Sequence, residues 1–148
     1  MFAWADFEQG APELAAIGRE KIEQHGFMLL GTTRRDGTAR ISPVEVRIVD
    51  GQLTMSFVRS STKVRDVRRD PRVLLHSPMV NADDPNDEFK LRGDAVEVED
   101  PQVREAAKLW QPPPELDVFS VDIESAAFVV WSKGEMRMTR WSRDRGLH

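Results

Sequence analysis

The stretch FMLLGTTRRDGTARISPVEVRIVDGQLTMSFV, residues 27–58, has the pattern of three consecutive antiparallel strands. It contains two Asp-Gly pairs, at 36–37 and 50–51, and Asp-Gly is a favoured dipeptide at tight hairpin turns. In its last residues Leu, Met and Phe alternate with Thr and Ser, which gives one apolar face and one small polar face with room for a flat molecule. The expected strands are 27–33, 39–49 and 52–58.

Proline and glycine divide the rest of the chain into short elements. Pro12 suits the first turn of a helix that ends at Gly26, and Asp100 with Pro101 suits the start of another. A short helix is also expected at 61–69. Further strands are expected at 72–77, 89–99, 118–131 and 135–141.

These elements predict a mainly β protein with six or seven short antiparallel strands and about three short peripheral helices. An open sheet of this kind would leave an exposed face and two free edges, so we expect a small closed β-barrel. In the strand at 89–99 the apolar alternation changes phase across Gly93, which is typical of a bulge or sharp bend. We expect one domain over 1–148, with flexible tails at 1–11 and 142–148.

The composition argues against several classes of function. The chain has 148 residues, a formal net charge of -4 and no cysteine, so disulfides, thiolate nucleophiles and cysteine metal sites are excluded. An acidic chain is a poor general binder of nucleic acids. We find no basic-then-apolar leader and no run of about 18 apolar residues, so we expect a cytoplasmic protein without a membrane segment.

The sequence motifs give little support to a metal site or to hydrolase or nucleotide-binding chemistry. The three histidines, His25, His76 and His148, lie far apart in the sequence, so no metal site is expected. The chain has no G-x-S-x-G, G-x-G-x-x-G or Walker motif. Hydrolase, dinucleotide-fold and P-loop functions therefore have no support.

The densest cluster of cations is RSSTKVRDVRRDPRV, residues 59–73, with six Lys and Arg side chains. At the start of its helix, the hydroxyls of Ser60, Ser61 and Thr62, the free backbone N–H groups and Lys63 point to one spot. The residues alone leave two interpretations open, an N-capped solvated helix and a binding site (here called the anion seat) for one small anion. A nucleic-acid patch is disfavoured, because no aromatic residues are interleaved.

The order of elements resembles the split-barrel flavin-binding proteins related to pyridoxamine-phosphate oxidase. The stretches that carry the resemblance are DGTARISPVEVRIVDGQLTMSFVRSSTKVRDVRRDPRVLL (36–75) and FKLRGDAVEVEDP (89–101). The similarity runs from about residue 27 to 141. It implies a split β-barrel and a homodimer with a cofactor groove between the protomers.

The resemblance also implies a set of cofactor-binding residues. Ser61, Thr62 and Lys63 would bind the flavin phosphate. The other residues implied to lie along the phosphate, ribityl chain and ring edge are Arg40, Ile41, Ser42, Pro43, Val44, Ser56 and Phe57. No side chain is implied to act as a catalytic acid or base.

The implied cofactor is FMN or a deazaflavin. The KVRDVRRDPR run is similar to the branch of the family that uses the deazaflavin coenzyme factor 420, whose acidic tail would benefit from basic residues such as Arg34, Arg35 or Arg59. The implied activity is an oxidoreductase that transfers hydride equivalents between this cofactor and a small organic substrate. The alternatives are a flavin- or haem-binding module without turnover, and an interaction domain without a ligand.

Overall fold

The computed structural model describes residues 1–79, 86–108 and 115–148. In these residues eight antiparallel strands form one sheet in the order β3-β2-β1-β4-β5-β6-β7-β8, and a further pairing of β3 with β6 closes a six-stranded barrel. The strands are β1 (Phe27–Thr33), β2 (Ala39–Val49), β3 (Gln52–Val58), β4 (Arg72–His76), β5 (Asp87–Glu97), β6 (Leu116–Ser132), β7 (Glu135–Ser142) and β8 (Gly146–Leu147).

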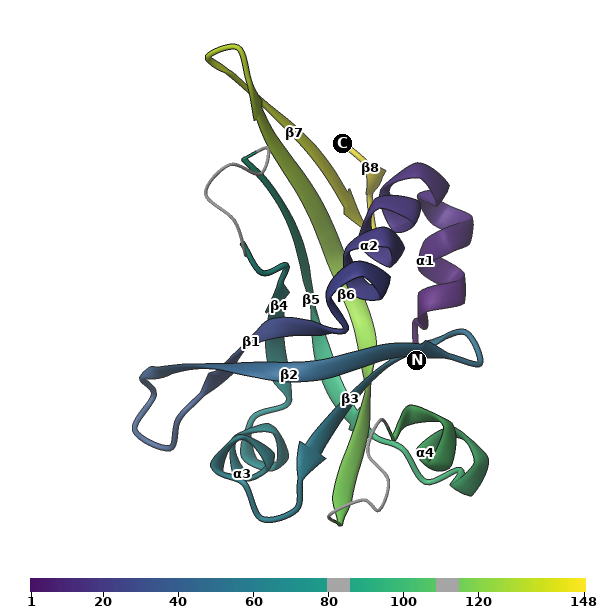
Figure 1. Ribbon diagram of the computed structural model, residues 1–148, viewed down its shortest axis with the longest axis vertical. Helices are drawn as coiled ribbons and strands as arrows, with labels where there is room; N and C mark the ends of the chain where they lie inside the picture. Colours follow the sequence, from purple (N-terminus) through teal and green to yellow (C-terminus); the bar gives the residue numbers. More distant parts are fainter. Residues whose placement is uncertain (80–85, 109–114) are drawn as a thin grey trace.

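Four helices lie outside the barrel in the described residues (Figure 1). They are α1 (Trp4–Gly10), α2 (Pro12–His25), α3 (Thr62–Arg69) and α4 (Pro101–Ala107). Helices α1 and α2 lie beside β6 and β7, whereas α3 and α4 lie near the other end of the molecule. None of the helices described is long and apolar enough to cross a membrane.

The three strands of residues 27–58 have the bounds that the sequence predicted. β1 pairs with β2, and β2 pairs with β3, both antiparallel. At the second hairpin Asp50 and Gly51 have φ values of 49° and 72°, the positive values that a tight hairpin turn needs. The predicted fold class, a mainly β protein built as a small closed antiparallel barrel with peripheral helices, is confirmed.

The predicted bulge at Gly93 is also confirmed. The pairing of β5 with β6 shifts register between Arg92 and Gly93. A Cβ on Gly93 would lie 2.1 Å from the carbonyl oxygen of Asp122, so only glycine fits this close approach. Around this point β6 changes its second neighbour, since residues 116–120 pair with β3 and residues 125–132 pair with β7.

Residues at both chain ends, in the segments 1–11 and 142–148 that are predicted to be flexible tails, pack against the rest of the protein. Trp4 and Phe7 of α1 are fully buried, and the Phe7 ring centroid lies 4.9 Å from that of Trp141. At the other end β8 pairs with β7. No local sequence pattern indicates α1, because its aromatic partner Trp141 comes from the opposite end of the chain.

Candidate functional site

The turn between β3 and α3 forms the start of the predicted anion seat. Ser60 has a φ of 69°, and the Ser61 N–H donates to the Val58 carbonyl at 3.1 Å, which turns the chain into the helix. Ser61 is the N-cap residue, but its side chain does not cap α3. The buried Ser61 Oγ has no hydrogen-bond partner among the described residues. The first-turn N–H groups are therefore available to an anion, and no other group competes for the Ser61 hydroxyl beside them.

Lys63 connects the start of α3 to β2, the strand that the family resemblance places along the flavin ring. Its Nζ lies 3.3 Å from the Pro43 carbonyl oxygen of β2. Burial lowers the pKa of the Lys63 ammonium from its ordinary value. A cation that is partly desolvated and sits in the first helical turn gains from an anion placed beside it.

The predicted residues of β2 divide between two faces of the strand. Ile41 is 73% exposed and Pro43 is exposed, so both face outward. Val44 is only 3% exposed and belongs to the barrel core. Ser42 is half-buried. The outward face next to Lys63 thus consists of Ile41 and Pro43, while Val44 can offer a ligand only its backbone.

Arg40 has a different environment, because it is held by a buried carboxylate. Its Nε donates to Asp66 Oδ2 at 2.7 Å, and Thr32 Oγ1 donates to the same oxygen at 2.8 Å. Arg69 donates to Asp66 Oδ1 at 3.0 Å. Burial disfavours the Asp66 anion, but the hydrogen bonds from Arg40, Thr32 and Arg69 outweigh it and hold the pKa of Asp66 below its ordinary value.

Two predicted residues of β3 direct their side chains to other parts of the molecule. Phe57 is fully buried, and its ring centroid lies 5.4 Å from that of Phe119 in the core. Ser56 Oγ donates to the Ala107 carbonyl of α4 at 3.2 Å. The structure therefore brings Ser61, Thr62 and Lys63 together with the outward residues of β2, and directs the Ser56 and Phe57 side chains elsewhere.

An arginine-rich hollow of about 430 Å³ adjoins the helix start. It is lined by Arg34, Arg35, Asp36, Arg40, Thr62, Arg65, Asp66 and Arg69. Arg34 and Arg35, which the sequence linked to an acidic cofactor tail, both belong to it. Arg59 does not, because it pairs with Glu115 at 2.7 Å and lies 3.7 Å from Asp117.

Asp66 is a residue of this region that the sequence did not single out. It pairs with Arg69 across one helical turn, and its side chain is only 4% exposed. The available signal was its position between Val64 and Val67, the buried apolar residues of α3. Asp66 fixes α3 to the β1–β2 hairpin, and so sets the position of Lys63.

The histidines do not gather into a metal site in the described residues. No group of three or more His, Cys, Asp or Glu side chains there could hold a metal ion. His76 is half-buried at the end of β4, where its Nε2 lies 3.1 Å from Glu88 Oε2 and its Nδ1 lies 2.6 Å from the Ser77 carbonyl. This agrees with a histidine that packs at the rim.

Comparison with known proteins gives a family and a set of similar folds. A family model described as pyridoxamine 5'-phosphate oxidase matches residues 16–130. No curated protein matches the sequence. The solved structures with a similar fold include PhzG from Burkholderia lata in complex with tetrahydrophenazine-1-carboxylic acid, with a TM-score of 0.68, 14% identity, and coverage of 98% of this chain and 90% of that one.

Two further similar structures carry different descriptions. One is a heme binding protein from Mycobacterium smegmatis, with a TM-score of 0.63, 19% identity, and coverage of 82% of this chain and 55% of that one. The other is described as an F420 reductase, with a TM-score of 0.53, 20% identity, and coverage of 68% and 87%. At these identities the likeness concerns the fold alone.

Proposed function

Because the chain belongs to the pyridoxamine 5'-phosphate oxidase family, we propose that it binds FMN or a deazaflavin and acts as an oxidoreductase on a small organic substrate. The cofactor would supply the hydride chemistry, and the protein would supply phosphate binding, ring orientation and exclusion of water. No acid or base from the chain is part of this proposal.

The observation that carries the proposal is the contact of Lys63 with Pro43. It brings the uncapped start of α3, with the unpartnered Ser61 Oγ, next to the outward face of β2. A phosphate held by Ser61, Thr62 and Lys63 leaves the rest of a flavin beside Ile41 and Pro43. The residues present therefore fit the phosphate and one face of the ring.

Two features support a deazaflavin as the second candidate cofactor. The arginine-rich hollow lies beside Thr62, where the acidic tail of such a cofactor could extend from the phosphate seat. A similar structure is also described as an F420 reductase. FMN, which has no such tail, would leave this hollow unused.

A homodimer is part of the proposed function. Ile41 and Pro43 face outward, so a ring placed on them would be covered by the chain on one side only. A second copy would cover the other side and exclude water. Light scattering of the protein with and without FMN tests this, and a monomer in both samples would contradict it.

The cofactor site is tested by titrating FMN and factor 420 into the wild type and into Lys63→Met, followed by absorbance and fluorescence. Loss of the charge at constant side-chain length should weaken binding of the preferred cofactor by about tenfold or more. Lys133→Met removes an exposed lysine from the β6–β7 turn and should bind as the wild type does. Unchanged affinity in Lys63→Met would overturn the assignment of this site.

A module that binds haem without turnover is the alternative, and a heme binding protein is among the similar structures. Titration with haemin under the same conditions distinguishes the two. A haem-type absorbance spectrum with no flavin binding would favour the alternative. Reoxidation of the reduced bound flavin by an added organic acceptor would favour the oxidoreductase.

A further inference from the structure

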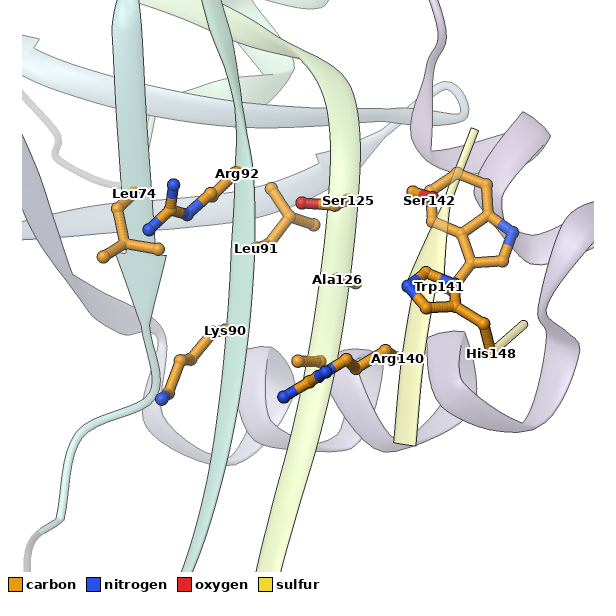
Figure 2. Close-up of a pocket in the computed structure, with 11 residues that line it drawn as sticks. Leu74, Lys90, Leu91, Arg92, Ser125, Ala126, Arg140, Trp141, Ser142 and His148 are labelled. Atoms are coloured by element: carbon orange, nitrogen blue, oxygen red, sulfur yellow. The ribbon is translucent and has the colours of Figure 1, made fainter. Parts of the chain in front are cut away.

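A second hollow lies on the outer face of the sheet, across β4 to β7, and has a volume of about 300 Å³. Figure 2 shows the side chains that surround it. Its lining is Leu74, Lys90, Leu91, Arg92, Ser125, Ala126, Ala127, Arg140, Trp141, Ser142 and His148. None of these residues belongs to the proposed cofactor site.

The strand register explains why a hollow forms here. Lys90, Ala127 and Arg140 are direct cross-strand partners on β5, β6 and β7, so their side chains emerge on the same face. Strand neighbours are about 4.8 Å apart, so the Cα atoms of Lys90 and Arg140 lie roughly 10 Å apart on either side of the alanine. The small Ala127 side chain thus leaves a gap that two long basic side chains flank.

A second row of cross-strand partners, beside the row of Lys90, Ala127 and Arg140, adds another cation. Arg92 has Leu74 and Ser125 as its cross-strand partners. Ser125 is small, so the space above Ala127 continues over it. Figure 2 shows Arg92, Lys90 and Arg140 around this common space, and Leu74 adds apolar surface at its edge.

The charge of the hollow is unusual for this protein. Its described lining includes three cationic side chains and no Asp or Glu, although the chain carries a net charge of -4. Lys90 Nζ pairs with Glu88 Oε1 at 2.7 Å, outside the lining. Arg140 Nε contacts the neutral Met138 Sδ, and no ion pair involves Arg92 in the described part of the chain. At least two of the three charges are therefore uncompensated.

We propose that this hollow binds a small organic oxyanion, a carboxylate or a phosphate ester with an apolar body. Arg92 and Arg140 would bind the oxyanion by charge-assisted hydrogen bonds, and Lys90 would add its charge. The apolar body would lie over Ala127 and Leu74. The volume suits one small molecule of this kind.

The hollow and the proposed cofactor site share one face of the sheet. Leu74 pairs with Gly31, and Gly31 pairs with Ile41, so one lateral row runs from Arg92 to Ile41. Three strand spacings put these two residues roughly 14 Å apart. The oxyanion site is nevertheless separate from the phosphate seat at Lys63, and its existence does not depend on flavin binding.

The test uses the full chain without any flavin, titrated with phenyl phosphate, benzoate and neutral benzyl alcohol at low ionic strength. Binding is followed by calorimetry and by NMR shifts of the Ala126 and Ala127 amides. We expect phenyl phosphate or benzoate to bind and benzyl alcohol not to bind. The stronger of the two anions identifies the oxyanion, phosphate ester or carboxylate, that the site prefers.

Three variants locate the binding. Arg92→Gln should weaken the affinity for the anion by about tenfold. Ala127→Leu changes no charge but fills the gap, and should abolish binding. Arg137→Ala removes an arginine from β7 that alternates to the other face, so it should leave affinity unchanged. All three positions are exposed or half-buried, and circular dichroism checks that each variant folds.

The proposal is overturned if neither organic anion binds to the wild type. It is also overturned if Arg137→Ala weakens binding as much as Arg92→Gln, because the attraction would then be a general surface charge effect. Lys63→Met should leave the anion-induced NMR shifts of the Ala126 and Ala127 amides as they are in the wild type. Equal loss in Lys63→Met would place the anion at the cofactor seat and contradict a separate site.

Discussion

The Arg40 guanidinium donates to the Asp66 carboxylate across 2.7 Å, and this bond joins the β1–β2 hairpin to helix α3. Asp66 is almost fully buried, whereas Arg40 keeps partial access to solvent. Thr32 and Arg69 complete the hydrogen bonds of the carboxylate. Because α3 carries Lys63, this buried pair also determines where the proposed phosphate seat lies.

We expect Asp66→Asn to destabilise the protein by about 3 kcal/mol, since it leaves Arg40 without its anionic partner. Urea unfolding of both proteins at about pH 7 measures the difference. Asp36→Asn is the matched control, because Asp36 is fully exposed and bonds only within its own turn, to Thr38. A change in that control as large as in Asp66→Asn would contradict the special role of the buried pair.

The same pair predicts how stability depends on pH. The folded pKa of Asp66 is below the ordinary value of 3.8, so the stabilisation is fully present above that value. It is lost as the pH falls through the folded pKa, because the folded protein then binds the proton too. Unfolding measured from about pH 7 to about pH 3 should therefore show wild type and Asp66→Asn converging at the acid end. If the difference in unfolding free energy between the two proteins stays constant with pH, the stabilisation does not come from the ionised Asp66 carboxylate.

Gly93→Ala should be strongly destabilising, because its Cβ would lie 2.1 Å from the Asp122 carbonyl oxygen. Moving the backbone of β6 away would disturb the bulge, and we expect a loss of about 3 kcal/mol. Gly31→Ala is the control within the same sheet, since its nearest neighbours would lie at an ordinary 3.6 Å. Thermal unfolding should show a large fall in Tm for the first variant and little change for the second. Similar Tm values for the two would contradict the close approach.

Helix α1 should contribute substantially to stability. Phe7→Ala removes a fully buried ring that packs on Trp4 and Trp141, and should cost about 3–5 kcal/mol. Gln9→Ala, at an exposed position of the same helix, should be close to neutral. Chemical unfolding of both variants checks this. A neutral Phe7→Ala would mean that residues 1–11 behave as the tail that the sequence predicted.

Local signals determine one part of the fold, and contacts between residues far apart in the sequence determine another. The strands of residues 27–58 were predicted to the residue because local signals, the two Asp-Gly turns and the alternation, determine them. α1 was missed because its stability comes from distant partners. The Phe2 N–H, for example, donates to Asp122 Oδ1 at 2.7 Å across 120 residues of sequence. No pattern of neighbouring residues in the sequence indicates such a contact.

The site shows the same division between local and distant information. The turn at Ser60 and the helix start at Thr62 follow from adjacent residues, and both lie where the sequence placed them. The direction of the Ser56 side chain toward α4 depends on how the barrel closes. The outer hollow depends on the register of four strands, so Arg92 and Arg140 gave no signal in the sequence.

The arginine-rich hollow should distinguish a deazaflavin with an acidic tail from FMN. Arg34→Ala and Arg35→Ala should each weaken factor 420 binding by about two- to fivefold, because the pairs they form with the tail are exposed to solvent. FMN does not reach the hollow, so its affinity should stay within error of the wild type. Fluorescence titrations at two salt concentrations provide the measurement, and the loss should shrink at high salt. Arg137→Ala controls for a general loss of charge. Equal weakening of FMN and factor 420 in Arg34→Ala would show that the hollow does not select the cofactor by its tail.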